Sequence, residues 1–386
     1  MTPHPPLPLG SAIGILGGGQ LGQMTAIAAR RLGYRTVVLD PDPASPGAQV
    51  ADQLVQGRLD DPAAIETLAQ HAAVVTYEFE NVDADAVATL ERRVPVHPSS
   101  QLLRTCQHRI REKLAIQALG GEVPPFRAVS SPPDLEAALP GLHLPLVVKT
   151  ASGGYDGKGQ AVVATASEAR AACQRLLSIS DTLIIEEHVD LALELSVICA
   201  RDEAGRITTY PAAENRHVGG ILDVSSAPAR VSAAVAHRAD QVTRQLAEGL
   251  GLVGVLAVEM FVDQQGRVLV NEMAPRPHNS GHHTLEACAT SQFEQLVRIL
   301  ARLPLGDTTL VRPAAMANLL GDWWSPDGEL PVARMLAVPG VVLHLYGKAA
   351  ARPGRKMGHL TALANTTEEA VERVLTARGR RPAVPC

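Results

Sequence analysis

Short apolar runs alternate with a longer amphipathic stretch over the first hundred residues of the chain. Residues 12–16 (AIGIL), 36–40 (TVVLD) and 73–76 (AVVT) are apolar and short, which predicts three buried strands. Between the first two runs, residues 20–32 carry the apolar spacing of a helix. Strand, helix and strand in this order predict a parallel α/β unit, and therefore a doubly wound, Rossmann-like domain at the start of the chain.

The pattern changes in the middle of the chain, after the boundary marked by Pro95 and Pro98. Residues 104–119 predict one continuous helix that is closed by two glycines. Residues 144–149 and 183–187 predict strands, and a glycine-rich stretch lies between them.

The last part of the chain is predicted to be rich in antiparallel strands. Residues 255–262 and 267–272 are strand-like and are separated by a turn at 263–266, which predicts a β-hairpin. From residue 314 onward, short apolar runs are separated by Gly and Pro, which is typical of antiparallel strands joined by turns. The fold class expected for the whole chain is therefore α/β with an α+β C-terminal part.

Composition narrows the classes of protein that the chain can belong to. Its 386 residues are enough for two or three packed domains, and 46% of them are apolar. The net charge of −5 argues against a general nucleic-acid binder, which would need a broad basic face. No apolar run is long enough to span a bilayer, so no membrane role is expected. Five dispersed cysteines without a C-x-x-C pair favour a reducing cytoplasm, and the proline-rich residues 1–10 are expected to form a short disordered tail.

The first apolar run ends in a glycine-rich turn that has two open interpretations. Gly17, Gly19 and Gly22 fit the pattern G-x-G-x-x-G, and Asp40 follows about twenty residues later. Glycines at these positions allow a tight turn and let a phosphate approach a helix N-terminus closely. The pattern fits a dinucleotide site, and it fits equally well a loop that only turns the chain from strand to helix.

A second glycine-rich stretch is more informative. Residues 153–159 (GGYDGKG) hold four glycines around a lysine, and such a loop can fold over phosphates through its main-chain N–H groups. It is not a Walker A loop, because the G-K-[ST] ending is missing. The alternative is a flexible hairpin tip with an incidental lysine.

Polar side chains gather on and after the predicted hairpin. Glu259, Asn271 and Glu272 stand on its two otherwise apolar arms, where carboxylates are costly unless they are paired or bind a metal. This set suits Mg²⁺ held against ATP phosphates, and a buried structural ion pair is the alternative. Residues 276–282 (RPHNSGH) follow at once and could hold a planar anion by bidentate hydrogen bonds. A polar surface turn is the alternative for this loop.

A basic cluster lies near the end of the chain. Lys348, Arg352, Arg355 and Lys356 fall within nine residues, while the stretch 330–367 holds no Asp or Glu. In an acidic chain this local reversal of sign indicates a site for an anion, and a solvated basic loop is the alternative.

Four of these motifs together resemble a known family. Lys149, residues 153–160 (GGYDGKGQ), Glu186, Glu259 and the Asn271–Glu272 pair are similar to the ATP-grasp superfamily. The motifs TYEFENV (76–82), GGYDGKGQ (153–160), NEMAPRPHNSGH (271–282) and RPGRKMGH (352–359), in this order, resemble the 5-(carboxyamino)imidazole ribonucleotide synthases. The resemblance extends from about residue 13 to residue 359, which is nearly the whole chain.

The resemblance implies an ATP-grasp fold with three parts: a Rossmann-like pre-ATP-grasp domain (1–106), a central lid domain (107–190) and a C-terminal mixed α+β domain with the metal and substrate sites (191–386). It also implies that the protein is usually a homodimer. It implies that ATP and bicarbonate carboxylate 5-aminoimidazole ribonucleotide through carboxyphosphate, giving ADP and phosphate in de novo purine biosynthesis. Mg²⁺ would assist, and Glu259 and Glu272 would bind it.

The same resemblance assigns roles to individual residues. The expected nucleotide contacts are Arg109, Lys149, the lid residues Gly154, Tyr155, Asp156, Gly157, Lys158, Gly159 and Gln160, the adenine-site residues Glu186, Glu187, His188 and Val189, the ribose ligand Glu194, and His217, Asn271 and Glu272. The residues expected around bicarbonate and the amine are Glu78, Tyr155, Asp156, Arg276, His278 and Asn279. Asp156 would manage the proton of the amine. Gln20, Lys348 and Arg355 would contact the ribonucleotide, the last two at its phosphate.

Two positions depart from the family pattern. His108 stands before Arg109, where the family often has an acid, and residues 191–193 before Glu194 are more apolar than usual. Neither change removes a group that the chemistry needs.

Several other functions remain to be weighed. A formate-using ATP-grasp transformylase acting on glycinamide ribonucleotide would differ in the loop 275–282, and a biotin carboxylase would be longer and need a carrier lysine. A non-catalytic nucleotide-binding module would not need the metal-type carboxylates. A Rossmann oxidoreductase follows from the first glycine-rich turn alone, and leaves the later motifs unexplained.

Overall fold

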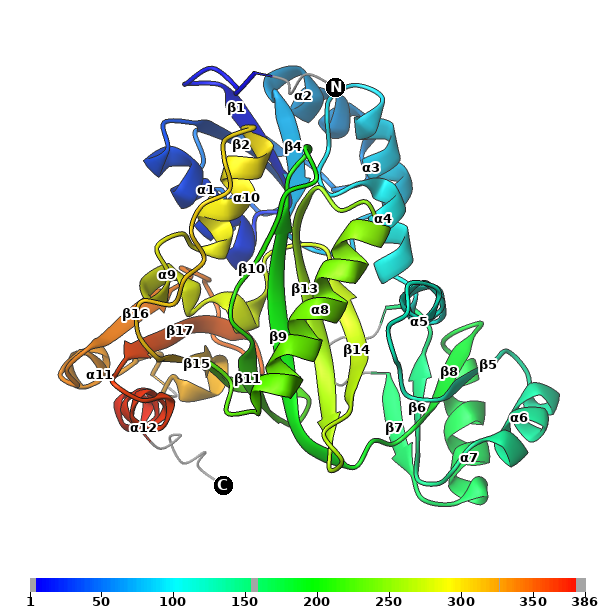
Figure 1. Cartoon of the computed structure of the whole chain (residues 1–386). Coiled ribbons are helices and arrows are strands. Elements are labelled where there is room, and N and C mark those ends of the chain that lie inside the picture. Colours follow the sequence, from blue (N-terminus) through cyan, green and yellow to red (C-terminus); the bar gives the residue numbers. More distant parts are fainter. Residues whose placement is uncertain (1–4, 154–158, 326, 380–386) are drawn as a thin grey trace.

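The computed structural model describes residues 5–153, 159–325 and 327–379, which form three β-sheets with helices packed against them (Figure 1). The first sheet is parallel, with the strand order β3-β2-β1-β4, and confirms the predicted Rossmann-like unit. Its elements are β1 (Ala12–Leu16), α1 (Gln20–Arg31), β2 (Arg35–Asp40), β3 (Gln53–Gln56), α2 (Pro62–His71), β4 (Val74–Tyr77) and α3 (Ala84–Glu91).

The continuous helix expected over residues 104–119 is wrong. Two helices, α4 (Ser100–Cys106) and α5 (Arg109–Ala118), meet at a break where His108 has extended backbone. The His108 ring accepts a hydrogen bond from the main-chain N–H of Arg111, and the N–H of Arg109 donates to the carbonyl of Ala151. A hydrogen bond to a distant strand end therefore replaces a bond within the helix, which local periodicity does not reveal.

The second sheet is small and antiparallel, with the order β5-β8-β6-β7. Its elements are β5 (Phe126–Val129), α6 (Pro132–Ala138), β6 (Leu146–Thr150), β7 (Gln160–Val163), α7 (Ala166–Leu177) and β8 (Leu183–Glu187). The glycine-rich stretch joins β6 to β7, and its residues 154–158 lie outside the described part of the chain.

The third sheet has nine strands, with the order β14-β13-β9-β11-β12-β15-β17-β16 and β10 paired with β9. It confirms the expected hairpin, as β13 and β14, and the antiparallel C-terminal strands. Its elements are β9 (Leu191–Arg201), β10 (Ile207–Thr209), β11 (Ala213–Val218), β12 (Ile221–Ala227), α8 (Ala233–Gly249), β13 (Gly254–Asp263), β14 (Val268–Ala274), α9 (Thr284–Ala287), α10 (Gln292–Leu300), β15 (Ala314–Leu320), α11 (Val332–Leu336), β16 (Val341–Leu345), β17 (Lys356–Leu363) and α12 (Thr367–Arg378).

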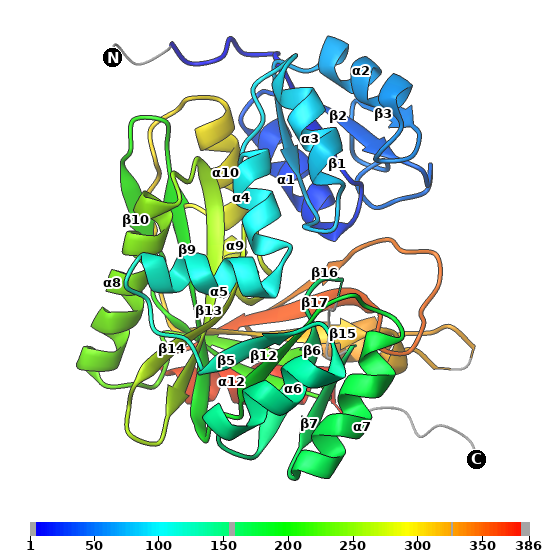
Figure 2. The same cartoon turned by 90° about the vertical axis from the view of Figure 1, so that its right-hand side faces the viewer.

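Alternate residues of the central strands β9 and β13 pack into two different cores, because successive side chains of a strand point to opposite faces. Leu256 and Val258 pack on the side of α8, whereas Val255 and Ala257 pack on the side of α10. The two helices thus cover opposite faces of these strands (Figure 2).

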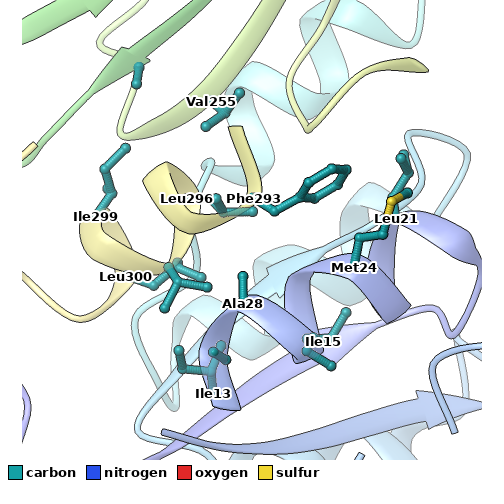
Figure 3. Packing of buried hydrophobic residues seen from close by; sticks show 14 of the residues in the cluster. Ile13, Ile15, Leu21, Met24, Ala28, Val255, Phe293, Leu296, Ile299 and Leu300 are labelled. Carbon is teal, nitrogen blue, oxygen red and sulfur yellow. The ribbon is translucent and has the colours of Figure 1, made fainter. Parts of the chain in front are cut away.

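Helix α10 also joins the large sheet to the N-terminal domain. Figure 3 shows Phe293 and Leu296 of α10 against Met24 and Ala28 of α1. Phe293 is fully buried, and burying one such side chain stabilises a fold by about 1.5–3 kcal/mol. This shared core fixes α1, and the loop before it, relative to the hairpin β13–β14.

The prediction of a disordered tail is wrong for residues 5–10, and residues 1–4 lie outside the described chain. The N–H of Leu7 donates to the carbonyl of Ala301, and the hydroxyl of Tyr34 donates to the carbonyl of Leu7. Leu7 also packs against the core that α1 and α10 share, so apolar burial fixes this segment despite its prolines. In the described ranges, no helix combines the length and apolarity needed to cross a bilayer.

Candidate active site

A single cavity of about 980 Å³ collects most of the residues predicted from the sequence. It opens among the three sheets, and the carboxyl ends of β1 and β4 reach it from the N-terminal domain. The predicted residues that line it are Gln20, Glu78, Arg109, Lys149, Gln160, Glu186, Glu187, His188, Val189, Glu194, His217, Glu259, Asn271, Glu272, Arg276, His278, Asn279, Lys348 and Arg355. Gly159 lies just before β7, where its carbonyl accepts from Thr150, whereas Gly154, Tyr155, Asp156, Gly157 and Lys158 fall outside the described residues.

A buried ionic cluster forms one wall of the cavity, where β6 and β8 pair side by side. The Lys149 ammonium donates to Oε2 of Glu186 over 2.7 Å, and the Lys113 ammonium lies 3.0 Å from Oε1 of the same carboxylate. Burial alone would raise the pKa of Glu186, but the two lysines lower it to about 2. Glu186 therefore holds Lys149 as a fixed positive charge facing the cavity.

Glu187, at the end of β8, lines the cavity and is held by His143. Glu187 accepts hydrogen bonds from the main chain and the ring of His143. On the neighbouring sheet, Glu194 of β9 contacts Nδ1 of His217 of β11 over 2.5 Å. Burial would lower the pKa of His217, but the Glu194 carboxylate raises it. The predicted ribose ligand thus has a histidine beside it that can hold its orientation.

The metal-type carboxylates face each other across the hairpin. Glu259 is the register partner of Glu272, and the ladder then shifts so that Met260 pairs with Val270. Asn271 is the extra residue of this β-bulge, which lets Asn271 and Glu272 both line the cavity although they are adjacent in the strand. A bulge that re-aims a side chain is common beside active sites.

Both carboxylates are paired with cations. Oε1 of Glu259 lies 2.8 Å from Nε2 of His278, and Oε2 of Glu272 lies 2.8 Å from Nη1 of Arg109. Burial would raise the pKa of Glu259, but His278 first of all lowers it to about 2. Glu259 is thus held ready to act as an anion at neutral pH.

The donor atoms at this site fit a Mg²⁺ ion that substrate phosphates also bind, rather than a metal held by protein side chains alone. Two carboxylates stand beside the Asn271 side-chain oxygen, which is buried and finds no hydrogen-bond partner in the described part of the chain. Across the part of the chain that the structure describes, no three or more His, Cys, Asp or Glu residues group to hold a metal by themselves. Mg²⁺ prefers oxygen ligands and commonly takes one or two carboxylates plus substrate phosphates, so the residues fit this ion.

The loop after the hairpin is buried, so the alternative of a polar surface turn is wrong. Arg276 is ion-paired with Glu80 and donates to the carbonyl of Pro277. Gln292 of α10 accepts from the N–H of His278 and donates to its carbonyl. Asn279 is 8% exposed, and neither polar atom of its amide has a hydrogen-bond partner among the described residues. A buried amide without a partner at a cavity wall is suited to a small polar ligand.

The main-chain N–H groups of the first glycine-rich turn are bound by carboxylates of the same chain. Both oxygens of Glu78 accept main-chain N–H groups at the start of α1, from Gly19 at 2.7 Å, Leu21 at 3.1 Å and Gly22 at 3.0 Å. Asp40 accepts the N–H of Gly18 at 2.7 Å. The carboxylate of Glu78 thus stands where the pyrophosphate of a dinucleotide would bind, which favours the interpretation as a turn and argues against the oxidoreductase.

The basic cluster forms the opposite end of the cavity. Lys348 donates to the carbonyl of Lys356 over 2.7 Å, and Arg355 donates to the carbonyl of Ala350 over 2.9 Å. Within the described chain, neither Lys348 nor Arg355 has a salt bridge to a carboxylate. Burial, with a smaller effect of Arg355, lowers the pKa of Lys348 to about 8. Lys348 and Arg355 thus both line this end of the cavity, as a site for an anionic ligand requires.

Three residues of this region were missed by sequence reasoning. Glu80 holds Arg276, while Glu112 and Lys113 contact the strand β14. Glu80 follows Glu78 within the motif TYEFENV, so the motif contained it. Glu112 and Lys113 follow Arg109 by three and four residues, which places all three on one face of a helix. That spacing was the available signal.

The fold and the site together define an ATP-grasp carbon–nitrogen ligase. Models of three families match the chain: a ribonucleotide synthetase preATP-grasp domain over residues 11–107, an ATP-grasp domain over 114–293, and a phosphoribosylaminoimidazole carboxylase C-terminal domain over 314–373. These matches agree with the fold expected from the sequence motifs.

Individual relatives identify the family within this class. The N5-carboxyaminoimidazole ribonucleotide synthase of Bacillus subtilis (strain 168) is 45% identical over 365 residues, covering 95% of this chain and 94% of the relative. The same enzyme of Brucella melitensis is 44% identical over 355 residues, covering 92% and 96%. The chain belongs to the N5-carboxyaminoimidazole ribonucleotide synthase family.

Solved structures agree with this assignment. An ADP complex of an N5-carboxyaminoimidazole ribonucleotide synthetase superposes with a TM-score of 0.90 at 44% identity, covering 97% of both chains. The Aspergillus clavatus enzyme in complex with ADP and 5-aminoimidazole ribonucleotide has a TM-score of 0.88 at 33% identity, covering 95% of this chain and 98% of that one. The formate-using alternative is not favoured by these relatives.

Proposed function

We propose that this chain carboxylates the amine of 5-aminoimidazole ribonucleotide with bicarbonate, using ATP, and releases ADP and phosphate. The observation that carries the proposal is one cavity with three kinds of anion-binding wall: the Lys149 cluster, the Arg276–Asn279 loop and the Lys348–Arg355 cluster. ATP, bicarbonate and a ribonucleotide phosphate are the three anions that this reaction brings together. The complex of the related Aspergillus clavatus enzyme with ADP and 5-aminoimidazole ribonucleotide supports the same pairing of ligands.

The nucleotide would lie between the small sheet and the hairpin β13–β14. Lys149 and Arg109 would bind its phosphates, the main chain of Glu187 to Val189 would read adenine, and Glu194 would bind the ribose. Glu259, Glu272 and the free oxygen of Asn271 would hold Mg²⁺, which when bound neutralises charge on the phosphates. The lid assigned to residues 154–160 remains a proposal, since 154–158 lie outside the described chain.

Bicarbonate would bind at the loop after the hairpin. The Arg276 guanidinium and the unpartnered Asn279 amide can hold a planar anion, and His278 can donate to it in place of Glu259. An oxygen of bicarbonate would attack the γ-phosphorus, ADP would leave, and the resulting carboxyphosphate would give up its carbon to the amine as phosphate departs. Shielding this mixed anhydride from water is what a closed cavity contributes.

The amine proton needs an acceptor once the carbon–nitrogen bond forms. Asp156 remains our proposal for this role, and Tyr155 is proposed beside it, although both residues lie outside the described chain. Glu78 lines the same cavity, and burial raises its pKa, but its two oxygens are engaged by main-chain N–H groups. Glu78 is therefore better suited to orient the amine by a shared hydrogen bond than to remove its proton. Gln20 at the start of α1 would contact the ribonucleotide.

The organisation of the protein is also part of the proposal. Each of the three sheets falls inside one of the segments 1–106, 107–190 and 191–386, which supports these as domain boundaries. We further propose a homodimer in the cytoplasm, in keeping with the family and with the dispersed free cysteines.

Release of ADP tests the function directly. ADP is measured with ATP, Mg²⁺ and bicarbonate, with and without 5-aminoimidazole ribonucleotide, and again with formate and glycinamide ribonucleotide. The proposal expects fast release only when bicarbonate and 5-aminoimidazole ribonucleotide are both present. Faster release with formate and glycinamide ribonucleotide would show that the substrate assignment is wrong.

A further inference from the structure

Helix α5 contacts the metal-binding strand at three consecutive residues. Arg109 pairs with the Glu272 carboxylate, Lys113 donates to the carbonyl of Asn271 over 3.2 Å, and Glu112 accepts the N–H of Met273 over 2.6 Å. The helix lies beside β14 in both views of the molecule (Figures 1 and 2). The main chain is thus held immediately before and immediately after Glu272.

The two residues that make the main-chain contacts are buried to an unusual degree for ionisable groups. Glu112 is 2% exposed and Lys113 is 1% exposed. Burying such groups is costly unless they are paired and hydrogen-bonded, so their position calls for a specific set of partners. Their hydrogen-bond and ion-pair partners are the strand β14 and the nucleotide-side carboxylate Glu186, and the two residues also attract each other along the helix.

Lys113 therefore connects two parts of the site. Its ammonium lies 3.0 Å from Glu186, which also holds Lys149, and 3.2 Å from the carbonyl of Asn271. The small sheet, which carries Lys149 and Glu186, and the hairpin, which carries Asn271 and Glu272, are therefore both contacted by this buried cation.

The β-bulge makes such a restraint necessary. Around Asn271 the regular ladder between β13 and β14 is interrupted, so the strand pairing alone does not fix this segment. The N–H of Met273 and the carbonyl of Asn271 are the main-chain groups that α5 binds. The helix supplies, from its side chains, the hydrogen bonds that hold the irregular part of the strand.

We propose that Glu112 and Lys113 are positioning residues that hold Glu272 at the distance from the nucleotide site at which one Mg²⁺ can bridge carboxylate and phosphate. The inference rests on the proposed nucleotide and metal site. Glu112 lines the cavity as well, but in this role both residues act through another group: Glu112 through the main chain of β14, and Lys113 through that main chain and through Glu186. Ligands must be held to within a fraction of an ångström for such a bridge, and supporting contacts of this kind tune metal affinity by tenfold to a hundredfold.

The test measures binding of ADP by calorimetry with and without Mg²⁺, together with thermal unfolding of each variant. Lys113→Met keeps the length and apolar body of the side chain but removes the ammonium. Its matched control is Arg111→Met, which removes a cation from the exposed face of the same helix. We expect Lys113→Met to reduce the Mg²⁺-dependent gain in ADP affinity by about tenfold or more. The control should keep the gain of the unaltered protein.

A second pair of variants decides the question if Lys113→Met does not fold. Glu112→Gln retains an oxygen that can accept the N–H of Met273, whereas Glu112→Leu has similar size and no acceptor. We expect Glu112→Leu to lose about tenfold more of the Mg²⁺-dependent gain than Glu112→Gln does.

The outcomes separate the inference from the function beneath it. If Mg²⁺ does not alter ADP affinity in the unaltered protein, the proposed metal site itself is wrong. If Mg²⁺ strengthens binding equally in the unaltered protein, Lys113→Met and Glu112→Leu, the positioning role is overturned. A lower melting temperature with an unchanged Mg²⁺ effect would likewise overturn it, since that is the result for residues that only stabilise the fold.

Discussion

The charged side chains at the two ends of the cavity have different kinds of partner. At the nucleotide end, Lys149 is matched by Glu186, and Glu272 is matched by Arg109. At the other end, Lys348 and Arg355 donate to main-chain carbonyls and, among the described residues, form no salt bridge to a carboxylate. An ion-paired side chain has a fixed position before any ligand binds. A group of cations without carboxylate partners attracts an anion, and the bound anion then neutralises their charge.

This difference predicts different consequences for the two ends. Loss of a charge at the paired end removes a group whose position is fixed before the nucleotide binds, and should affect the chemical step. Loss of a charge at the unmatched end removes one of several attractions and should affect mainly the affinity for one substrate.

The largest effect is expected for Glu272→Gln. The amide cannot replace a carboxylate that balances metal charge during phosphoryl transfer, so ADP release should fall by about two to three orders of magnitude. The side chain has nearly the same shape, and the melting temperature should change little. Steady-state ADP release at saturating substrates, with circular dichroism as the check on folding, measures both. Full turnover with an unchanged Mg²⁺ requirement would remove Glu272 from the metal site.

A smaller and more selective effect is expected at the unmatched end. In the proposed site, Lys348→Ala and Arg355→Ala would each remove one charged hydrogen bond to the ribonucleotide phosphate, which is typically worth about 1.5–3 kcal/mol. The KM for 5-aminoimidazole ribonucleotide should rise by about tenfold to a hundredfold, while the KM for ATP changes much less.

Kinetics that vary each substrate separately would distinguish the two ends. A parallel rise of both KM values, or no rise in either, would place the phosphate site elsewhere. The exposed Arg111→Met variant serves again as the control for a cation lost outside the cavity.

The smallest effect is a pH dependence carried by Lys348. Burial lowers the pKa of this ammonium to about 8, with Arg355, Glu78 and Lys356 as its charged neighbours. Only the protonated form attracts phosphate, so affinity is retained below pH 8 and lost as the pH rises through that value. The KM for 5-aminoimidazole ribonucleotide should rise by up to about fivefold from pH 8 to pH 9, with the KM for ATP nearly constant.

Lys348→Arg provides the control for this pH effect. A guanidinium stays charged throughout this range, so the variant should show a flat KM between pH 7 and pH 9 even if its affinity is lower. A pH dependence of the same size in Lys348→Arg would assign the titration to another group.

The parts of the molecule that were predicted correctly are those in which short sequence patterns decide the structure. The strand of residues 12–16 and the hairpin around 263–266 follow from apolar runs and a turn. The break at His108 could not be predicted this way, because its cause is a hydrogen bond between Arg109 and the distant Ala151. Local propensity does not contain that partner.

The candidate site shows the same division. The motif of residues 271–282 predicted that Glu272 and Arg276 belong to the site, and both line the cavity. The sequence did not reveal that their partners are Arg109, which is 163 positions away, and Glu80, which is 196 positions away. Such ion pairs form only when the three sheets pack together. The chemistry of each group could therefore be predicted from the sequence, but its ion-pair partner could not.

The carboxylate of Glu78 at the start of α1 has a consequence for which molecules the N-terminal domain can bind. A free dinucleotide that approached this loop would compete with a carboxylate that is attached to the same chain, and therefore present at a high effective concentration. Three main-chain N–H groups already have this partner, so a phosphate gains nothing there without expelling Glu78. The domain resembles a cofactor-binding fold in shape, but its own carboxylate, that of Glu78, occupies the site where a cofactor phosphate would bind. Nicotinamide dinucleotides should therefore be neither substrates nor inhibitors at this position.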